Sequence, residues 1–291
     1  MNIFCTGNQN KKNFYKTLIQ ISEISKKYNH TLYLNEKIYN TDLSDSVKKI
    51  SFQDFYKKKS SNIVFSIGGD GSLLNTIRLM NDLQLPTLGI NIGKLGFLNQ
   101  IHSTNIEENL DHFFKYEQYT IKEFNLLSAK ISYNDNAKGR SLLAVNDIVI
   151  NHGNLLRLIK FTIDLDKEHL NKYSSDGIIF STPLGSTAYS LSSGGPIVCP
   201  DIDGIIVTPI SPHSLSARPI VLDGKNKLHV SFDEEYSRIN ITADGQEQIK
   251  IDSECTIEIT KSNIKAKFIY PDNMDTYYSK LRNKLNWFGK Y

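Results

Sequence analysis

Apolar residues over roughly the first 120 positions form a pattern of short buried strands separated by helices. The run Ile63–Ile67 is β-branched, aromatic or small throughout, which is typical of a buried strand. Between Leu73 and Met80 the apolar positions recur at helical spacing, which predicts a helix with Ser72 as its N-cap. Strands that alternate with helices usually pair in parallel, so this region is expected to form an α/β domain.

The same criteria predict the other elements of this region. A helix is expected from Phe14 to near Tyr28, and a weak helix is expected before Lys59. Thr104 and Glu107 resemble a capping box, which predicts the start of a further helix. The remaining expected strands are Ile3–Cys5, Thr31–Leu34 and Pro86–Ile90.

After Tyr119 the pattern changes to short apolar runs separated by turn residues, as in antiparallel strands. A polar turn at Asn134–Lys138 indicates a hairpin, and the small residues Ser186–Ser192 indicate one short helix. Helical spacing returns at Tyr277–Trp287, and this helix is expected to pack on the first domain. The expected strands are Leu126–Tyr133, Ser141–Val145, Asp147–Ile150, Ile159–Leu165, Gly177–Ser181, Ile205–Val207, Leu228–Phe232, Arg238–Ala243, Thr256–Ile259 and Lys265–Ile269.

These patterns divide the chain into two domains. Residues 1–120 plus 271–291 are expected to form the α/β domain, and residues 121–270 an all-β domain, with a sandwich as its expected form. A length of 291 residues suits two modest domains or one large one.

Composition excludes several classes of partner. A net charge of +3 is too small to indicate nucleic acid, and no apolar run approaches the length of a membrane span. Cys5, Cys199 and Cys255 are far apart, which fits reduced thiols rather than a disulfide framework or a metal site. The chain starts with a strand-like run and lacks the features of a signal peptide. A cytoplasmic protein with no nucleic-acid or membrane partner is expected.

Candidate chemistry begins at the glycine turn Gly68–Ser72, which follows a predicted strand and starts a predicted helix. This arrangement directs backbone N–H groups and a helix dipole at an anion. The Asp70 carboxylate would repel a phosphate there, so its presence indicates that it binds a metal ion or accepts a proton from a hydroxyl group. The alternative is that Asp70 is a solvated turn residue. The turn lacks the G-x-G-x-x-G pattern, and Gly89–Leu95 is one residue short of a P-loop.

Other polar stretches suit a nucleotide. Asn146-Asp147 offers an amide beside a carboxylate for ribose hydroxyls or an adenine edge, although it could be a plain turn. The stretch Asp176–Pro196 is dense in Gly, Ser and Thr, as a phosphate- or sugar-binding loop would be. His213 and Arg218 could face phosphates or belong to a rigid surface loop. Asp244-Gly245-Gln246 primarily indicates a hairpin turn and only secondarily a binding site.

Together these stretches resemble the NAD kinase family over nearly the whole chain. The segments that occur in the family's order are GGDGS, GINIGKLGFL, ND, DGIIFSTPLGSTAYSLSSGGPIV, SPHSLSARPIV, DGQ and YYSKLRNKLNW. GGDG alone is a weak signal, because diacylglycerol kinases, sphingosine kinases and phosphofructokinases carry similar turns. The combination of GGDG with STPLGSTAYSLSSGGPI is highly specific for the NAD kinase family.

The resemblance implies a Rossmann-like or phosphofructokinase-like parallel α/β domain, an NAD-binding β-sandwich and a C-terminal helix that returns to the first domain. It implies Mg²⁺-dependent transfer of the ATP γ-phosphoryl group to the adenosine ribose 2′-hydroxyl of NAD, which gives NADP. The implied partners are NAD, ATP as donor, and further copies of the chain in a homodimer or homotetramer. Mg²⁺, or another divalent cation, would be held mainly by the ATP phosphates.

The resemblance also assigns site residues. Asp70 is the expected catalytic base, and His213 is a candidate phosphate contact. The donor phosphates are expected at Gly68, Gly69, Gly71 and Ser72. The residues expected to bind NAD are Asp70, Gly71, Phe97, Asn146, Asp147, Arg157, Ser174, Asp176, Thr187, Ala188, Tyr189, Ser190, Leu191, Ser192 and Gln246. No residue is expected to be a dedicated metal ligand.

One position departs from the family pattern. Many relatives carry Arg or Lys where this chain has Ser174, which leaves product affinity and acceptor choice open, and Lys172 is a candidate substitute. The use of ATP or polyphosphate, the preference for NAD or NADH, the oligomer size and regulation by NADP(H) are open as well. The alternatives are a lipid or sugar kinase of the GGDG group and a non-catalytic NADP(H)-binding module.

Overall fold

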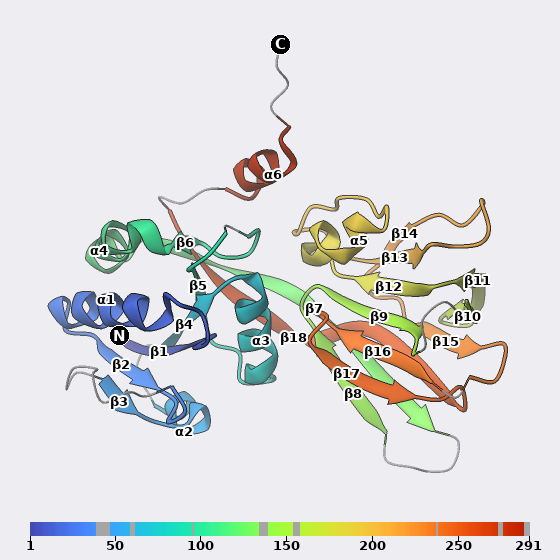
Figure 1. The fold of residues 1–291 in the computed structure, drawn as a ribbon, viewed down its shortest axis with the longest axis horizontal. Coiled ribbons are helices and arrows are strands. Elements are labelled where there is room, and N and C mark those ends of the chain that lie inside the picture. The colour runs from blue at the N-terminus through green and yellow to red at the C-terminus, as the bar shows by residue number, and fades with distance from the viewer. Residues whose placement is uncertain are drawn as a thin grey trace. The chain divides into compact units, whose positions relative to one another are not determined.

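The computed structural model describes residues 1–38, 47–58, 62–94, 96–133, 139–153, 158–236, 238–272 and 276–287. The chain divides into two compact units, coloured along the sequence in Figure 1. Unit 1 comprises Met1–Glu123 and Ala266–Tyr291, and unit 2 comprises Phe124–Lys265. None of the helices in the described residues has the length and apolar character needed to cross a bilayer.

Unit 1 is built on a parallel sheet with the strand order β3-β2-β1-β4-β5. The order reverses between β1 and β4, which is the switch point of a doubly wound α/β sheet. Beyond β5 the sheet continues with the last part of β18, through Phe268 opposite Thr87. The strands are β1 (Asn2–Gly7), β2 (Thr31–Leu34), β3 (Val47–Lys49), β4 (Asn62–Gly68), β5 (Thr87–Asn91), β6 (Ile101–His102) and β18 (Cys255–Pro271).

Helices cover the two faces of this sheet. Successive side chains of a strand point to opposite faces, so Ile3 contributes to the core beneath α1 and α4 while Phe4 points the other way. On that second face the Phe55 ring of α2 lies 5.3 Å from the rings of Phe4 and Tyr33. The helices of unit 1 are α1 (Phe14–Lys27), α2 (Phe52–Tyr56), α3 (Asp70–Met80), α4 (Ile106–Tyr116) and α6 (Tyr277–Leu285).

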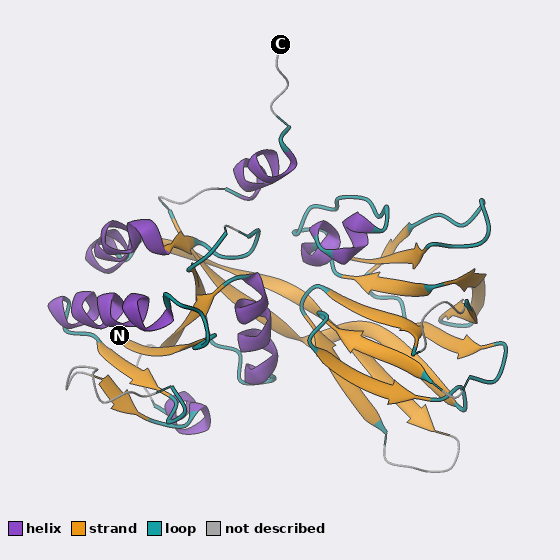
Figure 2. Ribbon diagram, viewed as in Figure 1, coloured by secondary structure: helices purple, strands orange, loops and turns teal. Residues whose placement is uncertain are grey.

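Unit 2 consists almost entirely of strands (orange in Figure 2) that form two layers around one apolar core. One layer has the antiparallel order β14-β13-β12-β9-β16-β17, and the other contains β11-β10-β15-β18 together with β7 and β8. Branched side chains alternate inward along both layers, which is how two stacked sheets share a core. The strands are β7 (Tyr119–Tyr133), β8 (Arg140–Ala144), β9 (Asp147–His152), β10 (Ile159–Leu165), β11 (Glu168–Ser175), β12 (Gly177–Ser181), β13 (Gly204–Ile210), β14 (Ile220–Asp223), β15 (Leu228–Phe232), β16 (Ile239–Ala243) and β17 (Glu247–Ile251).

The expected fold class, a parallel α/β region with a β-sandwich and a C-terminal helix, is confirmed. Several local predictions are wrong. Ser72 is not the N-cap of α3, because the extended backbone of Gly69 begins the helix at Asp70. Thr104 lies inside a 3₁₀ turn, Ser103–Asn105, so the α4 N-cap is Asn105 and no capping box forms.

Two other predicted helices differ in extent. The segment expected as one short helix is a 3₁₀ turn, Leu184–Thr187, followed by α5 (Tyr189–Ser192), with a break at Ala188. The C-terminal helix ends at Leu285, where Asn286 takes a left-handed conformation. The predicted turn Asn134–Lys138 lies outside the described residues.

Candidate active site

The Asp70 carboxylate is the centre of a hydrogen-bonded cluster in unit 1. Its Oδ2 accepts from the Phe97 N–H at 2.7 Å. Its Oδ1 accepts from the N–H groups of Leu98 at 3.2 Å and Asn99 at 3.3 Å, and from the Asn99 side-chain amide at 2.7 Å. Since Asp70 is the first residue of α3, its negative charge also lies at the positive end of the helix dipole.

Close packing holds the segment after β5 against this carboxylate. A Cβ on Gly96 would lie 2.1 Å from both Asp70 oxygens, so no residue with a side chain fits there without moving the carboxylate. The side chain of Gln100 accepts from the Gly89 N–H at 2.8 Å and donates to the Leu98 carbonyl at 2.6 Å. Phe97 is thus hydrogen-bonded to Asp70, beside the glycine turn. The assignment of Gly68, Gly69, Gly71 and Ser72 to the donor phosphates stays a prediction.

A cavity of about 370 Å³ lies on the α2–α3 face of unit 1. Thr6 and Gly7 line it at the end of β1, and Asn35 lines it just after β2. Asn75 and Leu79 of α3 form part of its wall, and the Leu79 side chain is 71% exposed. Ligands of doubly wound sheets bind outside the carboxyl ends of the strands at the switch point, which is where this cavity opens.

A second cavity, of about 310 Å³, lies in unit 2 and contains the Asn146-Asp147 pair. Ala188 and Tyr189 line it as well, so four of the residues predicted to bind NAD occur together. The Asn146 amide oxygen is buried with no hydrogen-bond partner among the described residues. Buried acceptors are normally paired, so such an atom is ready to accept from a bound molecule.

The turn between β16 and β17 fixes the backbone of this pair. Asp244 and Gly245 both have positive φ, at 51° and 63°, which turns the Asp244 carboxylate toward the end of β8. That carboxylate accepts from the N–H groups of Val145 at 3.1 Å, Asn146 at 2.7 Å and Asp147 at 3.2 Å. The expected Asp-Gly-Gln hairpin is confirmed, and its aspartate also shapes the cavity.

Burial and a neighbouring charge raise the pKa of Asp147 to about 7. Removal from water is the larger cause, and the negative charge of Asp244 is the second. A hydrogen bond from the Tyr189 backbone N–H acts in the opposite direction. A carboxyl group with this pKa can change protonation state near neutral pH when a ligand approaches.

Many hydroxyls of the Ser- and Thr-rich loop stabilise the loop itself. Thr182 donates to the Val145 carbonyl at 2.7 Å, and Ser181 donates to the Asn146 carbonyl at 3.0 Å. Ser190, predicted to bind NAD, is buried, and its hydroxyl lies 2.9 Å from that of Thr208. This loop therefore positions the Asn146-Asp147 pair from one side while Asp244 holds it from the other.

The other predicted NAD contacts lie outside the lining of this cavity. They are Ser174, Asp176, Thr187, Leu191, Ser192 and Gln246, and their assignment stays a prediction. The His213 N–H donates to the Ser174 carbonyl at 2.9 Å, so these two predicted residues are neighbours. Arg157 lies outside the described residues.

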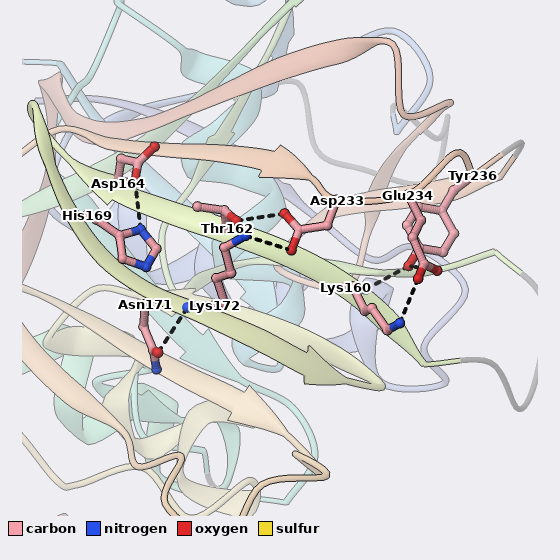
Figure 3. A network of polar contacts seen from close by, with 9 residues as sticks. All are labelled: Lys160, Thr162, Asp164, His169, Asn171, Lys172, Asp233, Glu234 and Tyr236. Atoms are coloured by element: carbon pink, nitrogen blue, oxygen red, sulfur yellow. Dashed lines mark hydrogen bonds and ion pairs between the residues drawn. The ribbon is translucent and has the colours of Figure 1, made fainter.

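Lysines near Ser174 already face carboxylates. Lys160 is directly opposite Ser174 in the β10–β11 pairing, and its Nζ lies 2.6 Å from Glu234 Oε1. Lys172 Nζ lies 3.5 Å from Asp233 Oδ2, and a dashed line marks this ion pair in Figure 3. Both pairs are at the surface, where ion pairs are weak, so either cation could turn to another anion at small cost.

Sequence reasoning did not identify some of the residues that build these sites. Val149 and Asn151 follow Asp147 at alternate positions of β9 and line the same cavity, which strand periodicity could have indicated. The Asn151 amide oxygen is also buried without a partner among the described residues. Asn99, whose side-chain amide donates to Asp70, lies in an irregular segment, so no periodic sequence pattern could have indicated it.

Comparisons with known proteins agree with this architecture. Residues 7–119 match the family model of the ATP-NAD kinase N-terminal domain, and residues 145–270 match that of the C-terminal domain. An NAD kinase from Clostridium beijerinckii is 39% identical over 225 residues, which cover 77% of this chain and 78% of that protein. An NAD kinase from Thermoanaerobacter is 37% identical over 253 residues, which cover 87% of each chain.

Solved structures show the same fold. A yeast NADH kinase complexed with NADH superposes with a TM-score of 0.86 at 22% identity, covering 100% of this chain and 88% of that one. An NAD kinase from Archaeoglobus fulgidus in complex with ATP gives a TM-score of 0.74 at 23% identity, covering 99% and 100%. The fold and the sequence matches thus define a kinase. The chain belongs to the NAD kinase family, which confirms the resemblance found in the sequence.

Proposed function

We propose that this chain transfers the γ-phosphoryl group of ATP to the adenosine ribose 2′-hydroxyl of NAD and so forms NADP and ADP. The observation that carries the proposal is the Asp70 carboxylate, fixed by four hydrogen bonds beside the glycine turn. Three of these bonds go to Oδ1 and one to Oδ2. Since each carboxylate oxygen has about two acceptor sites, Oδ2 can accept one more donor, and a substrate hydroxyl is the donor we assign to it.

In the proposed reaction one phosphoryl group and one proton are transferred. The 2′-oxygen forms a bond to the γ-phosphorus while the bond from that phosphorus to the leaving ADP oxygen breaks. A ribose hydroxyl is far less acidic than a carboxylic acid, so Asp70 would take its proton late, as the new bond forms. Positioning of the hydroxyl and stabilisation of charge supply most of the rate in such transfers, and a carboxylate held this firmly suits positioning.

Unit 2 would bind the adenosine part of NAD. The buried Asn146 amide oxygen suits the exocyclic amino group of adenine, and the Asp147 carboxyl suits ribose hydroxyls. Tyr189 is partly exposed at the rim of the same cavity, where its ring could lie against the base or sugar. The cavity volume of about 310 Å³ is in the range of small-ligand sites.

Unit 1 would bind the donor. The glycine turn would hold the ATP phosphates, and the cavity beside it would take the adenosine, since it combines apolar walls with amides such as those of Asn35 and Asn75. Among the described residues there is no cluster of three or more His, Cys, Asp or Glu side chains. Mg²⁺ typically binds through phosphates, waters and one or two carboxylates, so we expect it to enter with ATP.

The assay is NADP formation by the purified chain from NAD, ATP and Mg²⁺, read with an NADP-specific dehydrogenase. The variants are Asp70→Asn and, as a matched control, Asp82→Asn, an exposed aspartate just beyond α3. Loss of the acceptor should lower kcat by about 100-fold or more and leave calorimetric NAD binding largely intact. Asp82→Asn should behave as the wild type.

Other outcomes select other functions. NAD binding lost in parallel with activity would contradict the role of Asp70. NADP binding without turnover of ATP or polyphosphate would favour the non-catalytic binding module. The predicted homo-oligomer and cytoplasmic location remain part of this proposal; the first is tested by light scattering in solution and the second by cell fractionation.

A further inference from the structure

A lysine is buried in the C-terminal helix of unit 1. Lys280 is 3% exposed, whereas Lys284, one turn further along α6, faces solvent. The Thr276 hydroxyl caps the helix by accepting from the Ser279 N–H at 3.2 Å, and Leu281 is buried beside Lys280. Lys280 and Leu281 are the buried residues of this helix.

The ammonium group of Lys280 reaches the segment that holds Asp70. Its Nζ donates to the backbone carbonyl of Asn99 at 2.7 Å, across 181 positions of sequence. Asn99 is itself fully buried, and both its N–H and its side-chain amide donate to Asp70 Oδ1. One residue therefore connects the cation to the carboxylate: its carbonyl faces Lys280, and its donors face Asp70.

This lysine makes a contact that an apolar side chain could not make. Removing an ammonium group from water costs several kcal/mol, and a hydrogen bond to a buried carbonyl offsets part of that cost. Methionine has a similar length but no N–H donor, so it would fill the site and lose the bond to the Asn99 carbonyl.

We infer that Lys280 is a positioning residue, which fixes Asn99 and through it the orientation of the Asp70 carboxylate. The inference rests on the proposed function, since it matters for the reaction only if Asp70 acts there. By holding the Asn99 carbonyl, the ammonium keeps the Phe97–Asn99 donors aligned and leaves Oδ2 directed at the substrate hydroxyl. A misplacement of about 1 Å at a reacting group can cost up to about 100-fold in rate.

The first test compares Lys280→Met, Lys280→Arg and the matched control Lys284→Met in the full chain. Lys280→Met should lower kcat by about 10- to 100-fold and leave KM for NAD and for ATP nearly unchanged. Its melting temperature should fall, because the buried Asn99 carbonyl loses the Lys280 donor. Arginine keeps the charge and N–H donors, so Lys280→Arg should recover most of kcat. Lys284→Met should match the wild type.

Three results would overturn the inference: kcat of Lys280→Met close to that of the wild type, an equal loss in Lys284→Met, or a loss in Lys280→Arg as large as that in Lys280→Met. If Lys280→Met does not fold, Lys280→Leu replaces it, because leucine is also apolar and carries no N–H donor. The same criteria then apply.

Hydrogen exchange separates this inference from the proposed function. The amides of Phe97 and Leu98 donate to Asp70, so they should exchange faster in Lys280→Met and at the wild-type rate in Lys284→Met. If the wild type forms no NADP but this difference is found, the proposed function fails and the positioning of the segment stands. Unchanged exchange in both variants would overturn the positioning.

Discussion

The pH dependence of stability should reveal the buried carboxyl of Asp147. This side chain is 4% exposed, and its pKa rises from an ordinary value of 3.8 to about 7 in the folded chain. Below pH 3.8 the group carries a proton in both the folded and unfolded states, so it does not affect the free energy of unfolding. Between the two pKa values the folded state keeps the proton that the unfolded state has released, and stability falls as pH rises.

The size of the effect follows from the pKa difference. Each pH unit in this window lowers the free energy of unfolding by about 1.4 kcal/mol. From pH 5 to the folded pKa of about 7 is two units, so the wild type should lose about 3 kcal/mol between pH 5 and pH 8 through this group. Asp147→Asn cannot ionise, so this part of the slope should vanish and the variant should be the more stable protein at pH 8.

Urea unfolding at pH 5, 6, 7 and 8, followed by circular dichroism, measures the slope. Asp201→Asn is the matched control, because Asp201 is an exposed aspartate of the same unit. The reasoning would be refuted if wild type and Asp147→Asn lost the same free energy between pH 5 and pH 8. It would also fail if Asp201→Asn removed the slope as fully as Asp147→Asn.

Two further substitutions test the sites of unit 1. Gly96→Ala places a methyl group 2.1 Å from both Asp70 oxygens, so kcat should fall by about 100-fold with NAD binding unchanged. The control Gly93→Ala, whose nearest contact is at 4.0 Å, should be close to wild type. Equal kcat in the two variants would contradict the close approach of Gly96 to Asp70. Leu79→Glu puts a negative charge at the mouth of the unit 1 cavity, so it should raise KM for ATP by about 10-fold or more without changing KM for NAD. The control Ile19→Glu, on α1, should change neither KM. An unchanged KM for ATP in Leu79→Glu would show that the adenosine of ATP does not bind in this cavity.

The sequence pattern was sufficient to predict those features that depend on residues close together in the chain. The run Ile63–Ile67 predicts β4, and the glycines after it predict the turn that brings Asp70 to the start of α3. The fold class, too, followed from strands alternating with helices and then from strands alone. These features depend on neighbours in sequence, so periodicity is enough to find them.

Distant partners could not be predicted in the same way. Asp244 holds the backbone at Asn146 across 98 positions, and Lys280 reaches Asn99 across 181. Ser72 was misassigned because a serine before a helical pattern is a good N-cap, yet the extended Gly69 begins the helix without a side-chain cap. The strand Glu168–Ser175 was missed because its sequence is mostly polar and its exposed residues hide the alternation.

The division of the chain into units has a consequence for the order of synthesis. Unit 2 lies wholly within residues 124–265, whereas unit 1 begins at residue 1 and is completed by residues 266–291. Domains generally fold as they leave the ribosome. The strands of unit 2 can therefore pair before the last part of unit 1 has been made. An interrupted chain would retain the residues around Asn146 but lack Lys280, so the cavity of unit 2 could form before the hydrogen bond from Lys280 to Asn99.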